Sequence, residues 1–248
     1  MNILISGICG HMGLEVFEAA KDPSRGVAVV CGVDIAPSFG MPVPVYGSFD
    51  EVACAVDCIV DFSHHSATAE LTKYAIEKRI PLVIATTGQT DEEKDMIAEA
   101  AKQIPVFFAA NFSIGVALLC ALAKKTAAVM EDAEIEIVEV HHDRKLDAPS
   151  GTALAIAEAV KEARPGAYTV CGRSGHAKRG EGEIGISSVR IGNVVGIHEV
   201  IVGTKNETVT LKHEAHSRAL FASGAITAAK FVVSKEPGLY TMKDMITL

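Results

Sequence analysis

Residues 2–20 read NILISGICGHMGLEVFEAA, and this stretch decides the fold. An apolar run at 2–6 predicts a strand, and Gly7, Gly10 and Gly13 then lead into a helical pattern. Glycine permits a tight turn and lets a pyrophosphate approach the free N–H groups at a helix start. The GxxGxxG spacing therefore predicts a dinucleotide-binding unit, although a plain strand–turn–helix junction would look the same.

The following strand-like run, 27–34, ends in an acidic residue that lies 21 positions after Gly13. A carboxylate at this point can accept hydrogen bonds from the hydroxyls of an adenosine ribose. Asp34 is followed by Ile35 rather than by a cation that would neutralise a 2′-phosphate. We therefore expect NADH to be the preferred cofactor, with NADPH possible but weaker.

The alternation of strand and helix continues outward from this unit. Further apolar runs that read as strands lie at 58–63, 81–86 and 105–110, and helical patterns lie at 66–79 and 90–103. Thr90 and Glu93 have the spacing of a capping box at the start of the last helix. Nearly continuous Val- and Ile-rich strands are typical of a parallel sheet covered on both faces. The first 112 residues thus predict a Rossmann-like α/β domain.

Beyond the helical run 113–130 the pattern changes. Residues 133–140 alternate with period two, a helix is predicted at 152–163, and the tail returns to helix at 219–235. Three more alternating runs, without helices between them, lie at 186–192, 196–204 and 207–215. Successive strands of this kind predict an α+β domain with a mixed, open sheet that has one covered face.

A dense group of basic residues stands out at 141–155, which reads HHDRKLDAPSGTALA. The Pro-Ser-Gly-Thr step offers free N–H groups and hydroxyls at a helix start, an arrangement that binds anions. Lys145 adds a compact charge, and the histidines can donate hydrogen bonds or protons near neutral pH. Hydride delivered to an electron-poor ring leaves negative charge, which a cation and an acid can quench. We expect a small carboxylate-bearing substrate here.

Other interpretations of these residues have to be weighed. A basic loop before a helix is often only a solvated surface, and Arg144 fits that description. Adjacent residues of an extended segment point to opposite faces, so one of His141 and His142 could serve packing. Adjacent ligands seldom converge on a metal, and HEAH at 213–216 is one residue short of HExxH. We expect no metal.

Composition limits the class of protein. The chain has 248 residues, 49% of them hydrophobic, and a net charge of −8 with a pI near 5.6. This acidic balance argues against nucleic acid or an anionic membrane as a partner. The first residues lack the basic start of a signal peptide, and the apolar helical run at 114–123 is too short to span a bilayer. Six cysteines without a CxxC pair read, apart from Cys171, as core thiols of a cytoplasmic protein.

The motifs together resemble the 4-hydroxy-tetrahydrodipicolinate reductase (dihydrodipicolinate reductase) family almost from end to end. The shared elements are GxxGxMG, DFS after the third strand, ATTG, AANFSIGV, HHxxKxDAPSGTA, GEIGISSVRIGNVVGIHEV and GLYTMKDMI. The HHxxKxDAPSGTA element is highly specific, whereas each of the others is modest alone. The resemblance implies reduction of a cyclic dicarboxylate imine derivative by NADH or NADPH in diaminopimelate and lysine biosynthesis.

The resemblance also implies an organisation. Residues 1–112 and 219–248 would form the nucleotide domain, and 113–218 a substrate domain whose sheet builds a homotetramer, with hinges near Ser113 and Arg218. Implied catalytic residues are His141, as proton donor or shuttle, and Lys145. Implied substrate contacts are His142, Lys145, Ser150, Gly151 and Thr152. Implied cofactor contacts are Gly7, Ile8, Cys9, Gly10, His11, Met12, Asp34, Ala85, Thr86, Thr87, Ala109, Ala110, Asn111 and Phe112.

Some positions depart from the family pattern. Ile35 and His11 stand where members that use NADPH well often carry Arg, which weakens any expectation of tight NADPH binding. Two rivals stay open at this point. Another nicotinamide-dependent dehydrogenase would share the glycine loop without needing HHxxKxDAPSGTA, and a non-catalytic NADH sensor would not need Lys145.

Overall fold

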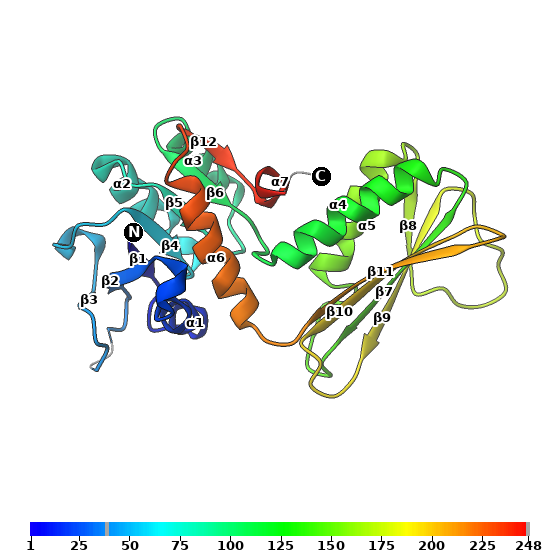
Figure 1. Ribbon diagram of the computed structural model, residues 1–248, viewed down its shortest axis with the longest axis horizontal. Helices are drawn as coiled ribbons and strands as arrows, with labels where there is room; N and C mark the ends of the chain where they lie inside the picture. Colours follow the sequence, from blue (N-terminus) through cyan, green and yellow to red (C-terminus); the bar gives the residue numbers. More distant parts are fainter. Residues whose placement is uncertain (38–39, 247–248) are drawn as a thin grey trace. The chain divides into compact units, whose positions relative to one another are not determined.

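The computed structural model describes residues 1–37 and 40–246. It divides into two compact units, which are drawn in Figure 1. Unit 1 comprises Met1–Ser113 and the segment that begins at Ala219, and unit 2 comprises Ile114–Arg218. Each unit has its own sheet. Within the described residues, no helix combines the length and the apolar character that a membrane crossing requires.

Unit 1 is built on a seven-stranded parallel sheet in the order β12-β6-β5-β4-β1-β2-β3. Its elements are β1 (Asn2–Ser6), α1 (His11–Ala20), η1 (Pro23–Arg25), β2 (Ala28–Val33), β3 (Val45–Tyr46), η2 (Phe49–Glu51), β4 (Cys58–Asp61), η3 (His65–Ala67), α2 (Thr68–Lys78), β5 (Leu82–Ile84), α3 (Asp91–Ala101), β6 (Pro105–Phe108), α6 (Ala219–Val232), β12 (Gly238–Tyr240) and α7 (Met242–Met245). The predicted Rossmann-like fold is confirmed.

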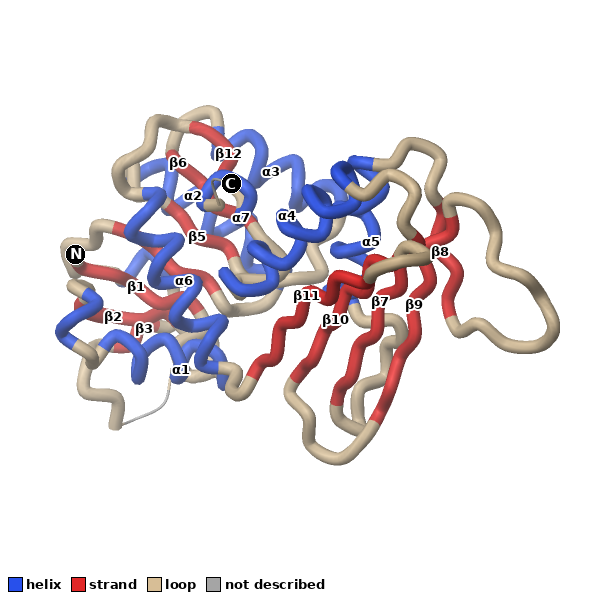
Figure 2. The backbone as a smooth tube through the Cα atoms, turned by 45° about the vertical axis from the view of Figure 1, so that its right-hand side comes forward, coloured by secondary structure: helices blue, strands red, loops and turns tan. Residues whose placement is uncertain are grey.

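The sheet of unit 1 is covered on both faces, as its continuous apolar strands predict. Ile3, Leu4 and Ile5 in the central strand are all fully buried. Leu4 belongs to the cluster that packs against α2 and α3, whereas α1 and α6 contact each other and the sheet on the opposite side (Figure 2). The capping box of Thr90 and Glu93 is present at the start of α3. Strand pairing and packing thus agree with the local sequence signals.

The turn after β1 needs glycine for steric reasons. Gly7 has φ of +78°, in the left-handed region that side chains rarely adopt. A Cβ on Gly13 would lie 2.1 Å from the carbonyl oxygen of Gly7, so α1 can approach the turn only without a side chain there. The GxxGxxG segment therefore forms the tight, closely packed turn that its glycine spacing predicts.

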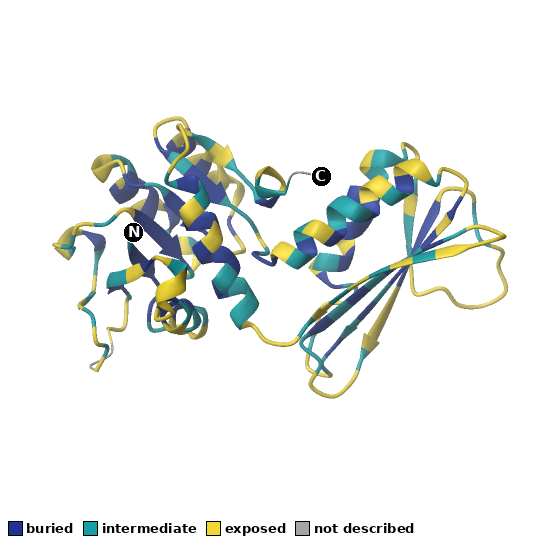
Figure 3. Ribbon diagram, in the orientation of Figure 1, coloured by how far each residue is buried: buried dark blue, intermediate teal, exposed yellow. Residues whose placement is uncertain are grey.

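Unit 2 contains a five-stranded mixed sheet in the order β11-β10-β7-β9-β8. Its elements are α4 (Ile114–Val129), β7 (Glu134–His141), α5 (Gly151–Ala163), β8 (Tyr168–Cys171), β9 (Glu183–Arg190), β10 (Gly196–Gly203) and β11 (Thr208–Ala215). Strand β7 runs parallel to β9 and antiparallel to β10. Alternate residues of β7 and β10 are buried (Figure 3), and Ile135, Ile137 and Val200 pack with residues of α4 and α5. The sheet is mixed and has one covered face, as predicted.

The cysteine expectation is only partly right. The six cysteines, all at described positions, form no disulfide, but only Cys31 and Cys58 are buried, while Cys9, Cys54 and Cys120 are half-buried. Cys171 is exposed, as its polar surroundings suggest. Apolar neighbours in the sequence place a residue in an element but do not decide which face it occupies.

Candidate active site

The loops predicted to hold the nucleotide line one edge of the unit 1 sheet. They follow the carboxyl ends of β1, β2, β5 and β6, which are parallel strands of one sheet. Backbone hydrogen bonds continue beyond the strands, from Gly7 N to the Val33 carbonyl at 2.8 Å and from Ala85 N to the Asp61 carbonyl at 2.9 Å. Ligands of open α/β sheets bind outside this edge. The fold therefore brings the separate loops together.

Asp34 lies directly against the glycine loop. Its Oδ2 accepts a hydrogen bond from Cys9 N at 2.9 Å, and its Oδ1 accepts one from Ala36 N at 3.0 Å. Each carboxylate oxygen has capacity for a further bond, so the group can still accept from ribose hydroxyls. The neighbouring Ile35 is 96% exposed and brings no charge to this point.

The predicted cofactor residues differ in what they can offer. Exposed members of the set are Gly10, His11, Thr87 and Ala110, and half-buried members are Gly7, Cys9, Met12, Ala109 and Asn111. The side chains of Ile8, Ala85, Thr86 and Phe112 are buried. These four can contact a ligand only through their backbone, because their side chains fill the unit itself.

Asp61 is a buried residue at this edge that sequence reasoning did not single out. The Thr86 hydroxyl donates to its Oδ2 at 2.6 Å, and the Ser63 hydroxyl donates to its Oδ1 at 2.6 Å. Burial raises the pKa of Asp61, and the hydrogen bonds from Ser63, Thr86 and Ser6 oppose that shift. Asp61 thus joins the ends of β1, β4 and β5, and it holds the Thr86 side chain that we expected to face the cofactor.

The basic segment of unit 2 begins on the covered face of its sheet. Glu139 is fully buried and His141 is 8% exposed. His141 Nδ1 lies 2.5 Å from Oε2 of Glu139. Arg190, in the neighbouring strand β9, donates through both Nη atoms to the two oxygens of Glu139 at 2.8 Å. The bidentate pair of Glu139 and Arg190 therefore holds the ring of His141, one of the two histidines predicted for the site.

Glu139 is ionised in this setting. Burial alone would raise its pKa, but hydrogen bonds from Arg190, Ser188 and His141 outweigh burial and bring the pKa to about 2. The same pairing raises the pKa of Arg190. Neither residue was predicted, because each partner lies far along the chain from the other.

The predicted anion site is the start of α5. The Ser150 hydroxyl accepts from Ala153 N at 3.2 Å and so caps the helix, and it also lies 3.1 Å from His198 Nε2. Ser150 is only 2% exposed, and its own N–H donates to Glu139. Gly151 is exposed, and a Cβ there would have no atom within 4 Å. The backbone N–H groups of the first turn, which begins at Gly151, are of the kind that suits an anion.

Several cations converge next to this helix start. Burial lowers the pKa of His142, and the charges of Arg144, Arg218, His141 and Lys145 lower it further. His142 Nδ1 is buried without a hydrogen-bond partner among residues 1–37 and 40–246. Lys145 Nζ pairs with Asp147 Oδ1 at 2.8 Å. The positive charges around His142 favour an anion nearby.

His198 completes the buried polar group and gives it a pH dependence. Burial lowers the pKa of His198 to about 4 from 6.5, and His141 adds to the shift. In the unfolded chain this histidine has a pKa near 6.5 and takes up its proton at a higher pH than in the folded protein. The free energy of unfolding therefore decreases as the pH falls below 6.5. Between pH 8 and pH 5 this histidine should cost the wild type about 2 kcal/mol of unfolding free energy, and we expect His198→Gln to be spared that loss.

Urea unfolding followed by circular dichroism at several pH values measures this loss. The exposed His216→Gln serves as the matched control and should keep the wild-type slope. An unchanged slope in His198→Gln would show that His198 is not the group that titrates.

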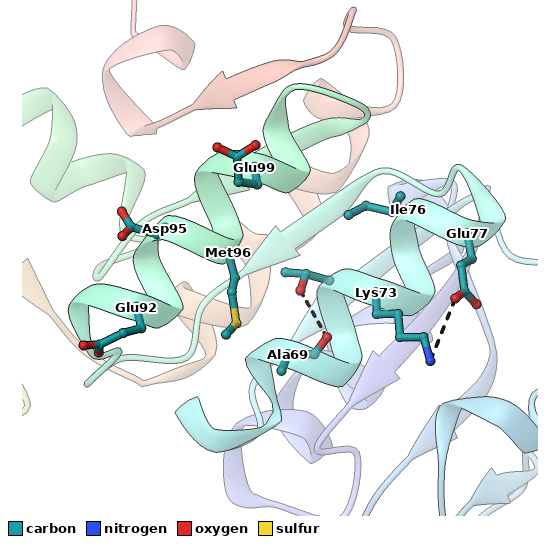
Figure 4. A pocket seen from close by; sticks show the side chains of 9 residues that line it. Ala69, Lys73, Ile76, Glu77, Glu92, Asp95, Met96 and Glu99 are labelled. Atoms are coloured by element: carbon teal, nitrogen blue, oxygen red, sulfur yellow. Dashed lines mark hydrogen bonds and ion pairs between the residues drawn. The ribbon is translucent and has the colours of Figure 1, made fainter.

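A separate groove lies between α2 and α3, away from all predicted site residues. Figure 4 shows side chains of both helices along it, including Lys73 and Ile76 from α2 and Met96 from α3. Its lining lacks histidine and cysteine, and its carboxylates are on exposed helix positions. The groove therefore offers none of the side chains predicted for the site. In the part of the chain that the structure describes, no three His, Cys, Asp or Glu side chains group as metal ligands.

Comparison with known proteins decides the family. The model for the N-terminal part of dihydrodipicolinate reductase matches residues 1–112, and the model for its C-terminal part matches residues 115–246. The chain belongs to the dihydrodipicolinate reductase family. The sequence-based resemblance to this family is thereby confirmed.

Individual relatives agree with this membership. The chain is 44% identical to the 4-hydroxy-tetrahydrodipicolinate reductase of Caldanaerobacter subterraneus subsp. tengcongensis, over 99% of this chain and 98% of the relative. It is 42% identical to the enzyme of Alkaliphilus oremlandii, over 100% and 99% of the two chains. A solved structure, a dipicolinate-bound dihydrodipicolinate reductase from Paenisporosarcina sp. TG-14, has a TM-score of 0.84 at 27% identity and covers 99% of each chain.

Proposed function

We propose that this protein reduces 4-hydroxy-tetrahydrodipicolinate to tetrahydrodipicolinate with NADH, in diaminopimelate and lysine biosynthesis. The observation that carries the proposal is the start of α5, where an exposed Gly151 with open space around it follows His142 and Lys145 in the basic segment. A small dicarboxylate needs such a concentration of positive charge and donors. Family membership adds support, because the named relatives carry this activity in their names.

The proposed roles follow from what each side chain is free to do. His141 and Lys145 provide the proton that the reduced ring requires. His142 and the N–H groups of Gly151 and Thr152 hold a substrate carboxylate. Ser150 acts indirectly, since its hydroxyl is used to cap α5.

The residues at the edge of unit 1 fit a dinucleotide. A side chain on Gly7 or Gly13 would clash with neighbouring backbone, and the Asp34 carboxylate sits beside this turn. When bound, NADH supplies the hydride. The chain's own contribution is to bind the pyrophosphate through backbone N–H groups and the ribose through Asp34.

The direct test is consumption of NADH with substrate made in situ from pyruvate and aspartate semialdehyde by the upstream synthase. Rapid turnover with NADH and slower turnover with NADPH would support the proposal. Demonstrable NADH binding without turnover with either cofactor would exclude the reductase activity and favour a nucleotide sensor.

Cofactor choice can be altered at Ile35. Because this side chain is 96% exposed, Ile35→Arg should leave the fold intact and place a cation where a 2′-phosphate would lie. A partly exposed charge-assisted bond is worth about 1.4 kcal/mol, so we expect kcat/KM for NADPH to rise about tenfold relative to NADH. Steady-state kinetics with both cofactors measure this ratio, and Val129→Arg, on exposed α4, is the control. An unchanged ratio would argue that Asp34 and Ile35 do not face the ribose.

We further propose a homotetramer that assembles through the unit 2 sheet. The sheet face opposite α4 and α5 carries half-buried Val138, Val140, Ile197 and Ile201, together with Val189, which is 41% exposed. Exposed apolar side chains on a strand face favour association, and the charged Glu136 and Glu199 on the same face would need partners across the interface. Sedimentation equilibrium measures the mass directly. The cytoplasm is the proposed location, which suits six cysteines that form no disulfide among the described residues.

A further inference from the structure

The carboxylate of Glu139 is surrounded by donors on every side. Its Oε1 accepts from Arg190 Nη2 at 2.8 Å and from Ser150 N at 3.1 Å. Its Oε2 accepts from Arg190 Nη1 at 2.8 Å and lies 2.5 Å from His141 Nδ1. An ionised carboxylate offers about four lone-pair positions and no proton. Ser188 also hydrogen-bonds to this carboxylate, so its acceptor positions are occupied and it has no proton to donate.

The hydrogen bonds of Glu139 determine which nitrogen of the His141 ring carries the proton. The contact between Glu139 and His141 needs one hydrogen, which the ionised carboxylate, with a pKa of about 2, does not carry. The hydrogen must therefore be on Nδ1 of His141. In the neutral ring the other nitrogen, Nε2, is then the acceptor, and in the protonated ring Nε2 is the donor.

The space next to Nε2 depends on a glycine in β10. A Cβ on Gly196 would lie 3.1 Å from His141 Nε2 and 3.4 Å from its Cδ2. The ring would have to yield by a few tenths of an ångström to admit even a methyl group there. Gly196 thus preserves both the ring position and the room at its reactive nitrogen.

We infer that Glu139, held by Arg190, fixes His141 as the Nδ1–H tautomer, and that Gly196 keeps Nε2 clear as the atom that exchanges the proton with substrate. Glu139, Arg190 and Gly196 are thereby positioning residues. The inference about Nε2 as the working atom rests on the proposed function, whereas the tautomer is a property of the resting protein. The two can therefore be tested apart.

Replacing Glu139 by Gln disrupts the arrangement in a specific way. The amide has one acceptor and one donor group, so it cannot accept from both Arg190 and His141 while keeping Ser150 N–H paired. In Glu139→Gln we expect the His141 ring to populate both neutral tautomers. We expect kcat to fall at least about a hundredfold, with KM for NADH unchanged. Glu134→Gln, at an exposed position of the same strand, is the matched control.

Long-range nitrogen–proton NMR of the histidine rings reads the tautomer without any turnover, with His141→Asn identifying the signal. Nδ1–H in the wild type and a mixture in Glu139→Gln would support the inference. Nε2–H in the wild type, or an unchanged tautomer in Glu139→Gln, would overturn it. If the tautomer responds but His141→Asn still turns over normally, the proposed catalytic role of His141 fails while the tautomer assignment stands.

Gly196→Ala provides a second variant that keeps all polar partners. We expect kcat to fall about tenfold, because the methyl group displaces the ring, while the tautomer stays Nδ1–H. The control is Gly203→Ala in the same strand, where a Cβ would meet its nearest atom at an ordinary 3.6 Å. Equal kcat in Gly196→Ala and the wild type would refute the role assigned to Gly196.

Discussion

Lys145→Ala is expected to lower kcat with NADH by about a thousandfold, within the range that a positioned acid contributes. The Lys145 ammonium pairs with Asp147, and this pairing lowers the pKa of Asp147. Removing it takes away the proposed proton donor and also leaves the negative charge of Asp147 in the proposed site. Steady-state and single-turnover kinetics measure the loss.

Lys145→Arg separates charge from proton transfer. Arginine keeps the positive charge but does not release its proton, so we expect substrate binding to recover while kcat stays low. Lys161→Ala on α5 is the matched control, since Lys161 forms an ion pair with the exposed Glu158 of the same helix. NADH turnover by Lys145→Ala within a factor of about two of wild type would remove this lysine from the mechanism.

Gly151→Val should weaken binding of pyridine-2,6-dicarboxylate about a hundredfold and leave NADH binding unchanged. No atom lies within 4 Å of a Cβ at this position, so the fold has no reason to resist the side chain. An anion at the helix start, however, would lose one or two charge-assisted hydrogen bonds of about 1.5–3 kcal/mol each. Titration calorimetry gives both dissociation constants.

The exposed Ala155→Val in the same helix controls for the lower helix propensity of valine. It should bind the dicarboxylate as the wild type does. If Gly151→Val also binds the dicarboxylate normally, the anion is held elsewhere, and the assignment of the α5 start fails.

Much of the fold follows from local sequence. The glycine loop, the capping box at Thr90 and the helix at 152–163 depend on neighbours a few residues apart, so their patterns are legible in one dimension. The short elements β3, β8, β12 and α7 were not predicted. Each has too few residues to show a period, and their pairing partners decide them.

The candidate site also has one part that local sequence predicts and another that only the fold brings together. His141, His142, Lys145 and Gly151 are gathered within one short segment, so the sequence alone determined that a basic group adjoins a helix start. Only the tertiary structure decided which distant residues contact that segment. Arg190 meets Glu139 from 51 positions away, and His198 meets Ser150 from 48. Such contacts depend on strand register, and register is set by the burial of one whole sheet face rather than by any local spacing.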